Sequence, residues 1–314
     1  MIEKHRIAVA AHIPPEGLSF NEIKELCLTA ERLGFDLFTI TDHFLNMANP
    51  LGKENHPLEC WTTLAGLAAV TSKIMLAPLV SCAHYRHPTV LAKMATTVDI
   101  ISNGRLIFGI GAGWHEEEFK QFLGRFPSAK ERVDGLEDAV IICKSMFESE
   151  VTSYEGKIYS AINTMNIPRP VRGYIPIMIG GSGKRLLKIA VKYADIIHIA
   201  GFPLMHELSE KLKLIRKYSR RLNKNLDEIV LAIGMKVIPV RDENKIISLT
   251  KFFIETKGMP IERAKEEVKR FIGPENIART LSAYHELGID LFTMPRLRIE
   301  EMEVLSRDVL PKIR

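Results

Sequence analysis

The chain has 314 residues, a hydrophobic fraction of 46% that suffices for a large buried core, and a formal net charge of +5 from 43 basic and 38 acidic side chains. The charges are interspersed and not gathered in blocks, so the composition does not demand nucleic acid as a partner. Length alone leaves open one large α/β domain or two ordinary ones.

The cysteines and the N-terminal stretch indicate a compartment. Cys27, Cys60, Cys82 and Cys143 stand far apart with no C-x-x-C pair, so neither a disulfide framework nor a zinc cluster is predicted. The apolar stretch 7–13 is too short for a signal or a membrane span. We therefore expect reduced thiols, no bound metal, and a soluble cytoplasmic protein that engages neither membrane nor nucleic acid.

Short apolar runs recur along the chain, each followed by a segment with apolar residues at helical spacing. The predicted strands are Arg6–His12, Asp36–Thr41, Ile74–Val80, Arg105–Gly111, Ile175–Ile179, Asp195–Ala200, Ile229–Val237 and Asp290–Met294. The predicted helices are Phe20–Leu33, Leu58–Thr71, Thr89–Ile101, Arg132–Phe147, Lys184–Tyr193, Met205–Leu222, Asn276–Leu287 and Ile299–Val309.

The predicted strands are almost continuously apolar, as is typical of a parallel sheet covered on both faces. Eight strand–helix alternations favour the α/β class and a closed (β/α)8 TIM barrel. An open doubly wound sheet is the alternative, because a strand count does not prove closure.

Two stretches interrupt the alternation. Residues 148–173 contain two prolines and two glycines, and residues 242–273 are polar and helical in pattern. Strand–helix units resume directly after each stretch, so we interpret both as insertions in a single domain that spans residues 1–314. In a barrel they would lie over or beside the mouth, where substrate specificity is usually built.

Polar residues follow the second predicted strand, which ends in Thr41, Asp42 and His43. Catalytic groups of barrel enzymes come from the carboxyl ends of the strands. An imidazole at His43 can donate a proton or a hydrogen bond to a reacting carbonyl, with Asp42 fixing its orientation or protonation. The structural alternative is that Asp42 caps the next loop and His43 only packs.

The third predicted strand leads into residues 79–88 (LVSCAHYRHP), an apolar strand end followed by a polar turn. Pro88 is suited to the first position of a helix. Arg86 and His87 can simply order this turn, whereas the strand end itself is a candidate for ligand contact.

Residues 109–119 (GIGAGWHEEEF) contain three glycines, which let the backbone come close to something flat or bulky. A dinucleotide fingerprint needs glycine where Trp114 stands, and the H-E-x-x-H motif needs histidine where Phe119 stands, so both motifs are absent. We interpret the acidic run 116–118 as a solvated face or the first turn of a helix.

Residues 180–183 (GGSG) join the fifth predicted strand to a helix. Backbone N–H groups at such a helix start form an anion site, and Lys184 and Arg185 add positive charge. A Walker loop is excluded, because Met178 replaces its first glycine and Arg185 its Ser or Thr. The loop predicts a bound phosphate; a tight turn that needs glycine for its backbone angles alone is the alternative.

Together these segments resemble the luciferase-like monooxygenase superfamily, whose members use FMN or the deazaflavin coenzyme F420. The most specific match runs from Ser102–Leu106 into residues 109–119 and is similar to the family pattern S-G-G-R-x-x-x-G-x-G-x-G-W. Residues 86–93, residues 41–43, the glycine loop and the prolines at 168 and 170 match as well. The resemblance extends from about residue 6 to 198 and is vague beyond.

The resemblance implies a TIM barrel with a cis peptide bond between Leu79 and Val80 and a flavin-type ring lying against that bulge. It implies that the phosphate of the cofactor lies on the glycine loop. The cofactor contacts implied in this way are Leu79, Val80, Ser81, Gly111, Gly113, Gly180, Gly181 and Ser182.

The resemblance leaves two cofactors open. Deazaflavin-dependent reductases of the superfamily often carry Asp-His at the end of the second strand, as Asp42 and His43 do here, and they transfer a hydride without using oxygen. We therefore favour coenzyme F420, with His43 as proton donor or polariser and Asp42 orienting that site. FMN is the alternative cofactor, in a monooxygenase whose reduced flavin reacts with oxygen.

The substrate side is expected to include Trp114, His198 and Arg296, each near the end of a predicted strand, around a small organic molecule. Many relatives in the superfamily are dimers, which makes a homodimer the expectation. A non-redox phosphate-binding barrel, such as an isomerase or aldolase with Lys236 or Asp42 as base, is the alternative from another class. A cofactor-binding but inactive relative is a third, which the two insertions disfavour.

Overall fold

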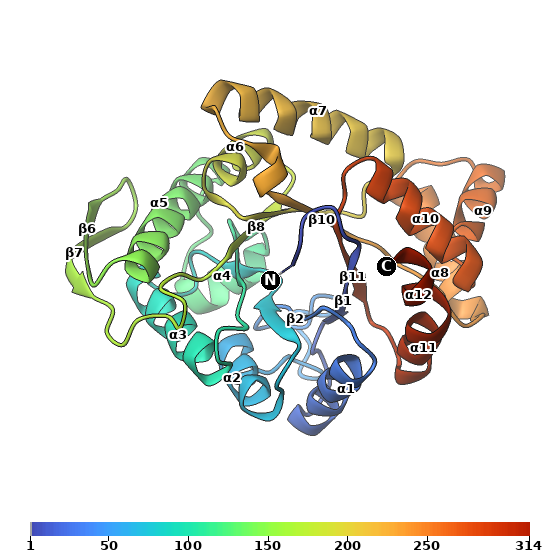
Figure 1. Ribbon diagram of the computed structural model, residues 1–314, viewed down its shortest axis with the longest axis horizontal. Coiled ribbons are helices and arrows are strands. Elements are labelled where there is room, and N and C mark those ends of the chain that lie inside the picture. The colour runs from blue at the N-terminus through green and yellow to red at the C-terminus, as the bar shows by residue number, and fades with distance from the viewer. Residues whose placement is uncertain (1) are drawn as a thin grey trace.

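The structure is a computed structural model that describes residues 2–314. Parallel strands form a barrel surrounded by helices (Figure 1). Within the described residues the sheet has nine strands, in the order β3-β2-β1-β11-β10-β9-β8-β5-β4. The strands are β1 Ala8–Ile13, β2 Leu37–Ile40, β3 Met75–Pro78, β4 Ser81–Cys82, β5 Phe108–Gly111, β8 Ile177–Gly181, β9 Ile196–Ile199, β10 Val230–Gly234 and β11 Leu291–Pro295.

The barrel closes between β3 and the segment that leads into β5. Leu76 donates its N–H to the Arg105 carbonyl at 3.0 Å and accepts from the Ile107 N–H at 2.8 Å. These bonds form a parallel bridge between Leu76 and Leu106, and every neighbouring pair of the sheet is parallel as well. The bridge therefore closes the parallel sheet into a ring. The predicted TIM barrel is confirmed, and the open sheet is wrong.

Helices cover the outside of the barrel, and all eight predicted ones are present. They are α1 Phe20–Arg32, α2 Cys60–Val70, α3 Pro88–Ile101, α5 Ala129–Glu148, α6 Lys184–Tyr193, α7 Met205–Leu222, α10 Pro274–Glu286 and α11 Ile299–Val304. The last continues through a π-helical turn, Leu305–Val309, into α12 Leu310–Ile313. The short helices α4 Glu116–Leu123 and Leu226–Glu228, a 3-10 turn, were not among the predicted elements.

The inside of the barrel is filled by alternate residues of the strands, and its chemistry changes toward the mouth. The lower layers are apolar: Ala8, Ala10, Leu37, Ala77, Ile107, Met178, Ile196, Val230, Ala232 and Leu291. Two positions further along four of these strands the side chains are polar: His12, Thr39, His198 and Thr293. Because every second residue of a strand faces the inside of the barrel, a polar layer lies on top of an apolar one.

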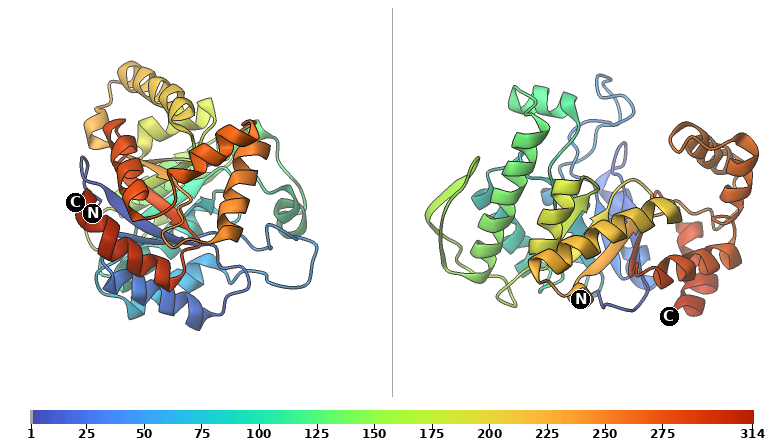
Figure 2. Two further views of the ribbon diagram at one scale, coloured as in Figure 1. Left: turned by 90° about the vertical axis from the view of Figure 1, so that its right-hand side faces the viewer. Right: turned by 90° about the horizontal axis from the view of Figure 1, so that it is seen from above.

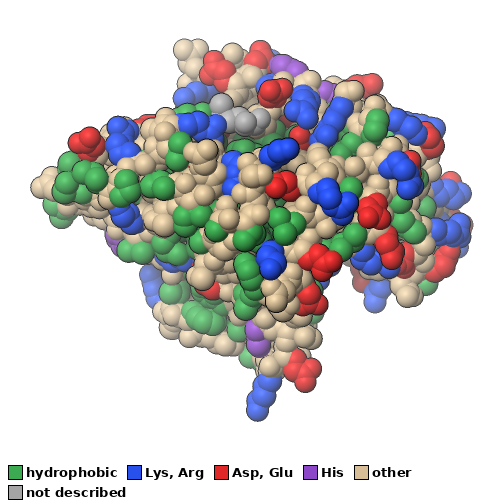
Figure 3. All heavy atoms as spheres, turned by 60° about the horizontal axis from the view of Figure 1, so that its bottom comes forward, with side chains coloured by type: hydrophobic (Ala, Val, Ile, Leu, Met, Phe, Trp, Pro, Cys, Tyr) green, Lys and Arg blue, Asp and Glu red, His purple; other side chains and the backbone are tan. Residues whose placement is uncertain are grey.

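The two insertions have different structures. Residues 148–173 contain an antiparallel hairpin, β6 Val151–Glu155 and β7 Ser160–Met165, which was not predicted and packs on α5. Its exposed side carries several apolar side chains among polar ones (Figure 3, left end), such as Ile162 and Met165. Residues 242–273 contain α8 Glu243–Glu255 and α9 Ile261–Lys269, as their pattern predicts.

The mouth of the barrel is marked by the segments that rise around it. The loop after β2, helix α4 and the α8–α9 pair rise on one side of the barrel, and the N-terminus lies on the other (Figure 2, right). Among the described residues, no helix is both long and apolar enough to cross a membrane.

Candidate active site

A cavity of about 440 Å³ lies at the carboxyl ends of the strands, a size usual for small-molecule sites. Its lining comes from many strand ends: His12, Asp42, His43, Leu79, Val80, Ser81, Cys82, Tyr85, Gly111, Ala112, Gly113, Trp114, Gly180, Gly181, Leu186, His198, Ala200, Gly201, Gly234, Thr293 and Pro295. Neither insertion contributes a residue to this lining.

An apolar bulge forms one wall of the cavity. The Leu79–Val80 peptide bond between β3 and β4 is cis, at the position that the sequence resemblance implied. The Val80 side chain fits between two glycines: a Cβ built on Gly111 would lie 2.7 Å from Val80 Cγ2, and one on Gly180 2.9 Å from Val80 Cγ1. Glycine is therefore required at both positions for the bulge to sit where it does.

The glycine loop lies beside this bulge and leads into α6. Gly180 and Gly181 line the cavity, and Ser182 does not. Gly183 is the N-cap of α6 and offers no side-chain acceptor to the first turn of the helix. Lys211 donates a hydrogen bond to the Ser182 carbonyl at 2.8 Å and fixes the loop from behind. Helix start and loop thus form the kind of site that binds an anion such as phosphate.

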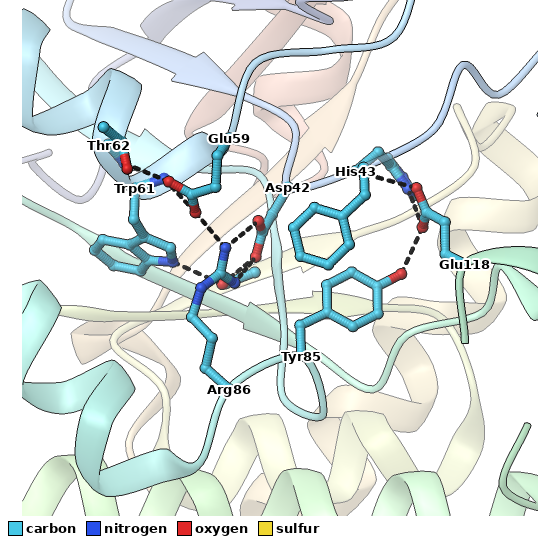
Figure 4. A network of polar contacts seen from close by, with 10 residues as sticks. Asp42, His43, Glu59, Trp61, Thr62, Tyr85, Arg86 and Glu118 are labelled. Atoms are coloured by element: carbon cyan, nitrogen blue, oxygen red, sulfur yellow. Dashed lines mark hydrogen bonds and ion pairs between the residues drawn. The ribbon is translucent and has the colours of Figure 1, made fainter. Parts of the chain in front are cut away.

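His43 is held by a carboxylate from another part of the chain (Figure 4). Glu118, on α4, is fully buried and accepts a hydrogen bond from His43 Nδ1 at 2.8 Å. The Tyr85 hydroxyl donates to the same oxygen, and the backbone N–H groups of Phe44 and Leu45 donate to the other at 2.8 and 3.0 Å. An ionised carboxylate only accepts, so His43 Nδ1 carries a hydrogen and Nε2 is left for exchange with a ligand.

These bonds decide the charge of Glu118. Burial alone would raise its pKa, but the hydrogen bond and attraction of His43, with the bonds from Tyr85 and the Leu45 N–H, outweigh burial and lower the pKa to about 2. Glu118 is therefore an anion at neutral pH. The acidic run was interpreted as a solvated face or a first helical turn; it begins α4, but Glu118 is buried and not solvated.

Asp42 points away from His43 and into a separate network (Figure 4). Its buried carboxylate forms a two-pronged ion pair with Arg86, at 2.7 and 3.0 Å, and accepts a hydrogen bond from Ser81 at 2.5 Å. The Trp61 indole donates to Ser81 in turn, at 2.9 Å, and Arg86 also pairs with Glu59. The expectation that Asp42 orients His43 is wrong: Glu118 does so, and Asp42 holds the strand that follows the bulge.

The same network decides the charge of Arg86. Burial would lower its pKa, but hydrogen bonds and attraction from Asp42 and Glu59 outweigh burial and raise the pKa above its usual value. Arg86 therefore stays charged and remains an ion-pair partner for the buried Asp42 carboxylate. Among the described residues no cluster of His, Cys, Asp and Glu side chains is arranged to hold a metal ion.

Three substrate-side residues were predicted, and two line the cavity. The Trp114 ring stands edge-on to the His43 ring, with centroids 5.8 Å apart. His198 is buried in the wall, with Nε2 2.9 Å from Thr293 Oγ1. Arg296 lies outside the lining, mostly exposed, and pairs with Glu16 at 3.2 Å.

Lys236 is placed unlike a catalytic base. Its ammonium lies 4.4 Å from the centre of the Phe252 ring and does not line the cavity. A non-redox barrel that uses this lysine as its base is therefore not supported by its position.

Sequence reasoning missed Glu118, Tyr85 and His12 as site residues. For Glu118 the signal was its spacing, because it lies four residues before Phe122 and a helix would place both on one face. In the structure the Phe122 ring packs on the Phe44 ring, with centroids 4.6 Å apart. For His12 the signal was a polar residue at the carboxyl end of an apolar strand. Tyr85 gave none.

The comparisons with known proteins decide the family. A sequence profile described as luciferase-like monooxygenase matches residues 5–294. The chain belongs to this family. An F420-dependent glucose-6-phosphate dehydrogenase of Amycolatopsis mediterranei is 24% identical over 93% of this chain and 94% of its own length. Pyrimidine monooxygenase RutA of Rhizobium rhizogenes is 29% identical over 60% of this chain and 52% of its own length.

The fold of this luciferase-like protein also matches solved structures. An F420-dependent secondary alcohol dehydrogenase in complex with an F420-acetone adduct superimposes with a TM-score of 0.81, at 17% identity, over 98% of this chain and 99% of that one. At this identity the match supports the barrel and not the substrate. Together the relatives make this protein an oxidoreductase or monooxygenase, with the cofactor left open between F420 and FMN.

The residues present fit a flat ring with a phosphate tail. The bulge at Val80 has an apolar face with no side chain on the glycines beside it, and the start of α6 is free for an anion. Gly113 has φ +75° and a Cβ there would lie 2.5 Å from Cys82 Sγ, so the backbone in this part of the cavity lining is also closely packed. We find no residue in this lining that would block such a group.

Proposed function

We propose that this protein is a two-electron oxidoreductase that uses coenzyme F420 to transfer a hydride to or from a small organic substrate. The observation that carries the proposal is one cavity lined by two different kinds of residue. The bulge and the glycine loop suit a flat ring and its phosphate, and His43, which has a buried anionic partner, lines the same cavity. Such a site can exchange both a hydride and a proton with one substrate.

The residues of the cavity would have separate roles in this reaction. When bound, the deazaflavin supplies the two-electron chemistry. His43, fixed through Nδ1 by Glu118, presents Nε2 as the atom that gives or takes the substrate proton. Trp114, edge-on to that ring and lining the cavity, would cover the substrate. Asp42 and Arg86 would keep the bulge in place through Ser81.

Similarity along the whole chain supports F420 over FMN. Two F420-dependent glucose-6-phosphate dehydrogenases each match more than nine tenths of the chain, whereas RutA of Rhizobium rhizogenes matches 60%. The second candidate, an FMN-dependent monooxygenase, is favoured by the RutA similarity, which is the higher in identity. We further propose that residues 1–314 act as one domain and as a homodimer, which sedimentation equilibrium would test.

Cofactor titration tests the choice of ring. We expect the full-length protein to bind F420 at least about tenfold more tightly than FMN, a difference of about 1.4 kcal/mol, when ring fluorescence is followed. With substrate, F420 should change redox state without consumption of oxygen. Tighter FMN binding with oxygen uptake would make the protein a monooxygenase, and binding of neither would refute the redox proposal.

A charge placed at the glycine loop tests the phosphate site. Ser182→Asp is expected to weaken cofactor binding about tenfold, because a carboxylate there repels a phosphate at the start of α6. Ser182→Ala, the matched control, should stay within about twofold of the parent affinity, since the loop contact from Lys211 is to the backbone. Equal affinities of the two variants would contradict the phosphate assignment.

A further inference from the structure

His12 occupies the polar layer inside the barrel and lines the cavity. Its Nδ1 lies 2.9 Å from Thr39 Oγ1, on the neighbouring strand. The Thr39 backbone raises the pKa of the ring, as a carbonyl beside a ring N–H does. Because Nδ1 is the ring nitrogen beside Thr39, we assign the hydrogen of the ring to Nδ1. In the neutral imidazole, Nε2 is then a bare acceptor.

Within the described part of the chain, that acceptor is left without a partner. Among residues 2–314, His12 Nε2 has no hydrogen-bond partner, and it is not one of the buried polar atoms enclosed without one. The atom is therefore accessible, and the lining of the cavity is where the ring is accessible. An accessible acceptor inside a small-molecule cavity is a position for a donor of the ligand.

The ring stays neutral at any ordinary pH. Burial lowers its pKa first of all, and the nearby His198, Arg296 and His43 lower it further, against a raising effect of the Thr39 bond, to about 3. His198 is held neutral too, because burial lowers its pKa to about 4. Its Nε2 donates to Thr293 Oγ1, whose own hydroxyl donates to the Ile233 carbonyl at 3.3 Å.

We propose that His12 Nε2 is a specificity site that accepts a hydrogen bond from an uncharged O–H or N–H group of the substrate. The inference rests on the proposed function, because it assigns the substrate side of the same cavity. A neutral acceptor attracts a neutral donor and disfavours a carboxylate or phosphate, which offers only acceptors. The substrate class is thus one with a hydroxyl, amine or amide group held at the polar layer.

This role differs from that of His43. A group with a pKa of about 3 is a poor proton acceptor near neutrality, so His12 binds and orients a donor and does not take its proton. Gly234, on β10 between β9 and β11, has no side chain, and a Cβ on it would reach ordinary contact with Thr293 Oγ1 at 3.7 Å. The wall between His12 and His198 therefore carries no side chain at Gly234 that would exclude a ligand group.

Cyclohexanol and cyclohexanone form a matched pair of probes, because they have one size and differ in the donor. We expect cyclohexanol, added to full-length protein labelled with ¹⁵N-histidine, to shift the Nε2 resonance of His12, and cyclohexanone to leave it in place. His12→Phe should weaken cyclohexanol binding about tenfold and change cyclohexanone binding by less than about twofold. His12→Gln, which keeps an acceptor, should recover part of the loss.

The outcomes separate this inference from the proposed function. The probes are measured without cofactor and again with F420, so a protein that discriminates the alcohol but binds no cofactor would refute the function and retain the site. A protein that binds F420 but shows equal affinity for both probes would overturn the site alone. The ¹⁵N signal of His12 should distinguish cyclohexanol from cyclohexanone equally well at pH 7 and pH 5. If it no longer did so at pH 5, the proposed site would also be refuted.

Discussion

Replacing Glu118 by glutamine is expected to lower turnover about 100-fold while cofactor affinity stays within about twofold. Glu118 is the buried anion that holds a hydrogen on His43 Nδ1 and fixes the ring toward the cavity. An amide can still accept one hydrogen bond, but it carries no charge and can hold the ring in the wrong tautomer. Steady-state kinetics with a separate cofactor titration measures both quantities.

The chain offers a matched control one residue away. Glu117→Gln changes the same side chain in the same helical turn, but Glu117 only bonds the exposed Gln121, so turnover should remain within about twofold. His43→Ala should resemble Glu118→Gln in turnover and also keep cofactor binding. A Glu118→Gln variant with undiminished turnover would show that the His43–Glu118 pair plays no part in the reaction.

The same carboxylate makes stability depend on pH. Its pKa in the folded protein is about 2, below the ordinary value of 4.5, so the stability it contributes is present above pH 4.5 and is lost as the pH falls toward 2. Relative to the glutamine variant, the parent should lose its advantage in free energy of unfolding over that interval. Urea unfolding at several pH values measures the difference, and an advantage that grows on acidification would contradict the assignment.

The second large effect is expected for Asp42→Asn, which should lower the free energy of unfolding by about 3 kcal/mol. The change removes the buried charge that pairs with the partly buried Arg86 and weakens the hydrogen bond from Ser81, next to the bulge. Cofactor affinity should fall with it, because Val80 and its flanking glycines pack only when that strand is in place. Urea unfolding and cofactor titration measure these losses.

Glu59→Gln is the matched control, because it removes the other carboxylate that pairs with Arg86. Glu59 is partly exposed, so we expect a loss below about 1.5 kcal/mol, part of it from weaker capping of α2. If Asp42→Asn instead shifted the pH profile of turnover and left unfolding unchanged, Asp42 would act on the protonation of His43, as the sequence first suggested.

Local features of the sequence foretold most of the fold. All eight main strands were predicted, because covered parallel strands are continuously apolar and each is followed by helical spacing. The hairpin β6–β7 was missed, since an exposed two-stranded insertion with Ile162 and Met165 on its open face lacks an apolar pattern of its own. Helix α4 was not among the predicted helices, although the acidic run 116–118 was interpreted as a solvated face or a first helical turn, because its eight residues are too few and too acidic at the start to show helical spacing.

The candidate site, like the fold, was determined in part by the sequence and in part by the tertiary structure. Sequence by itself determined the glycine loop, the glycines of 109–113 and the place of His43, because glycine and strand-end signals are local in the chain. Only the tertiary structure decided that Glu118, 75 residues away, holds His43, that Asp42 turns instead to Arg86, and that Arg296 stays outside the cavity. Those pairings depend on the direction of each side chain across the barrel, which spacing along the chain does not specify.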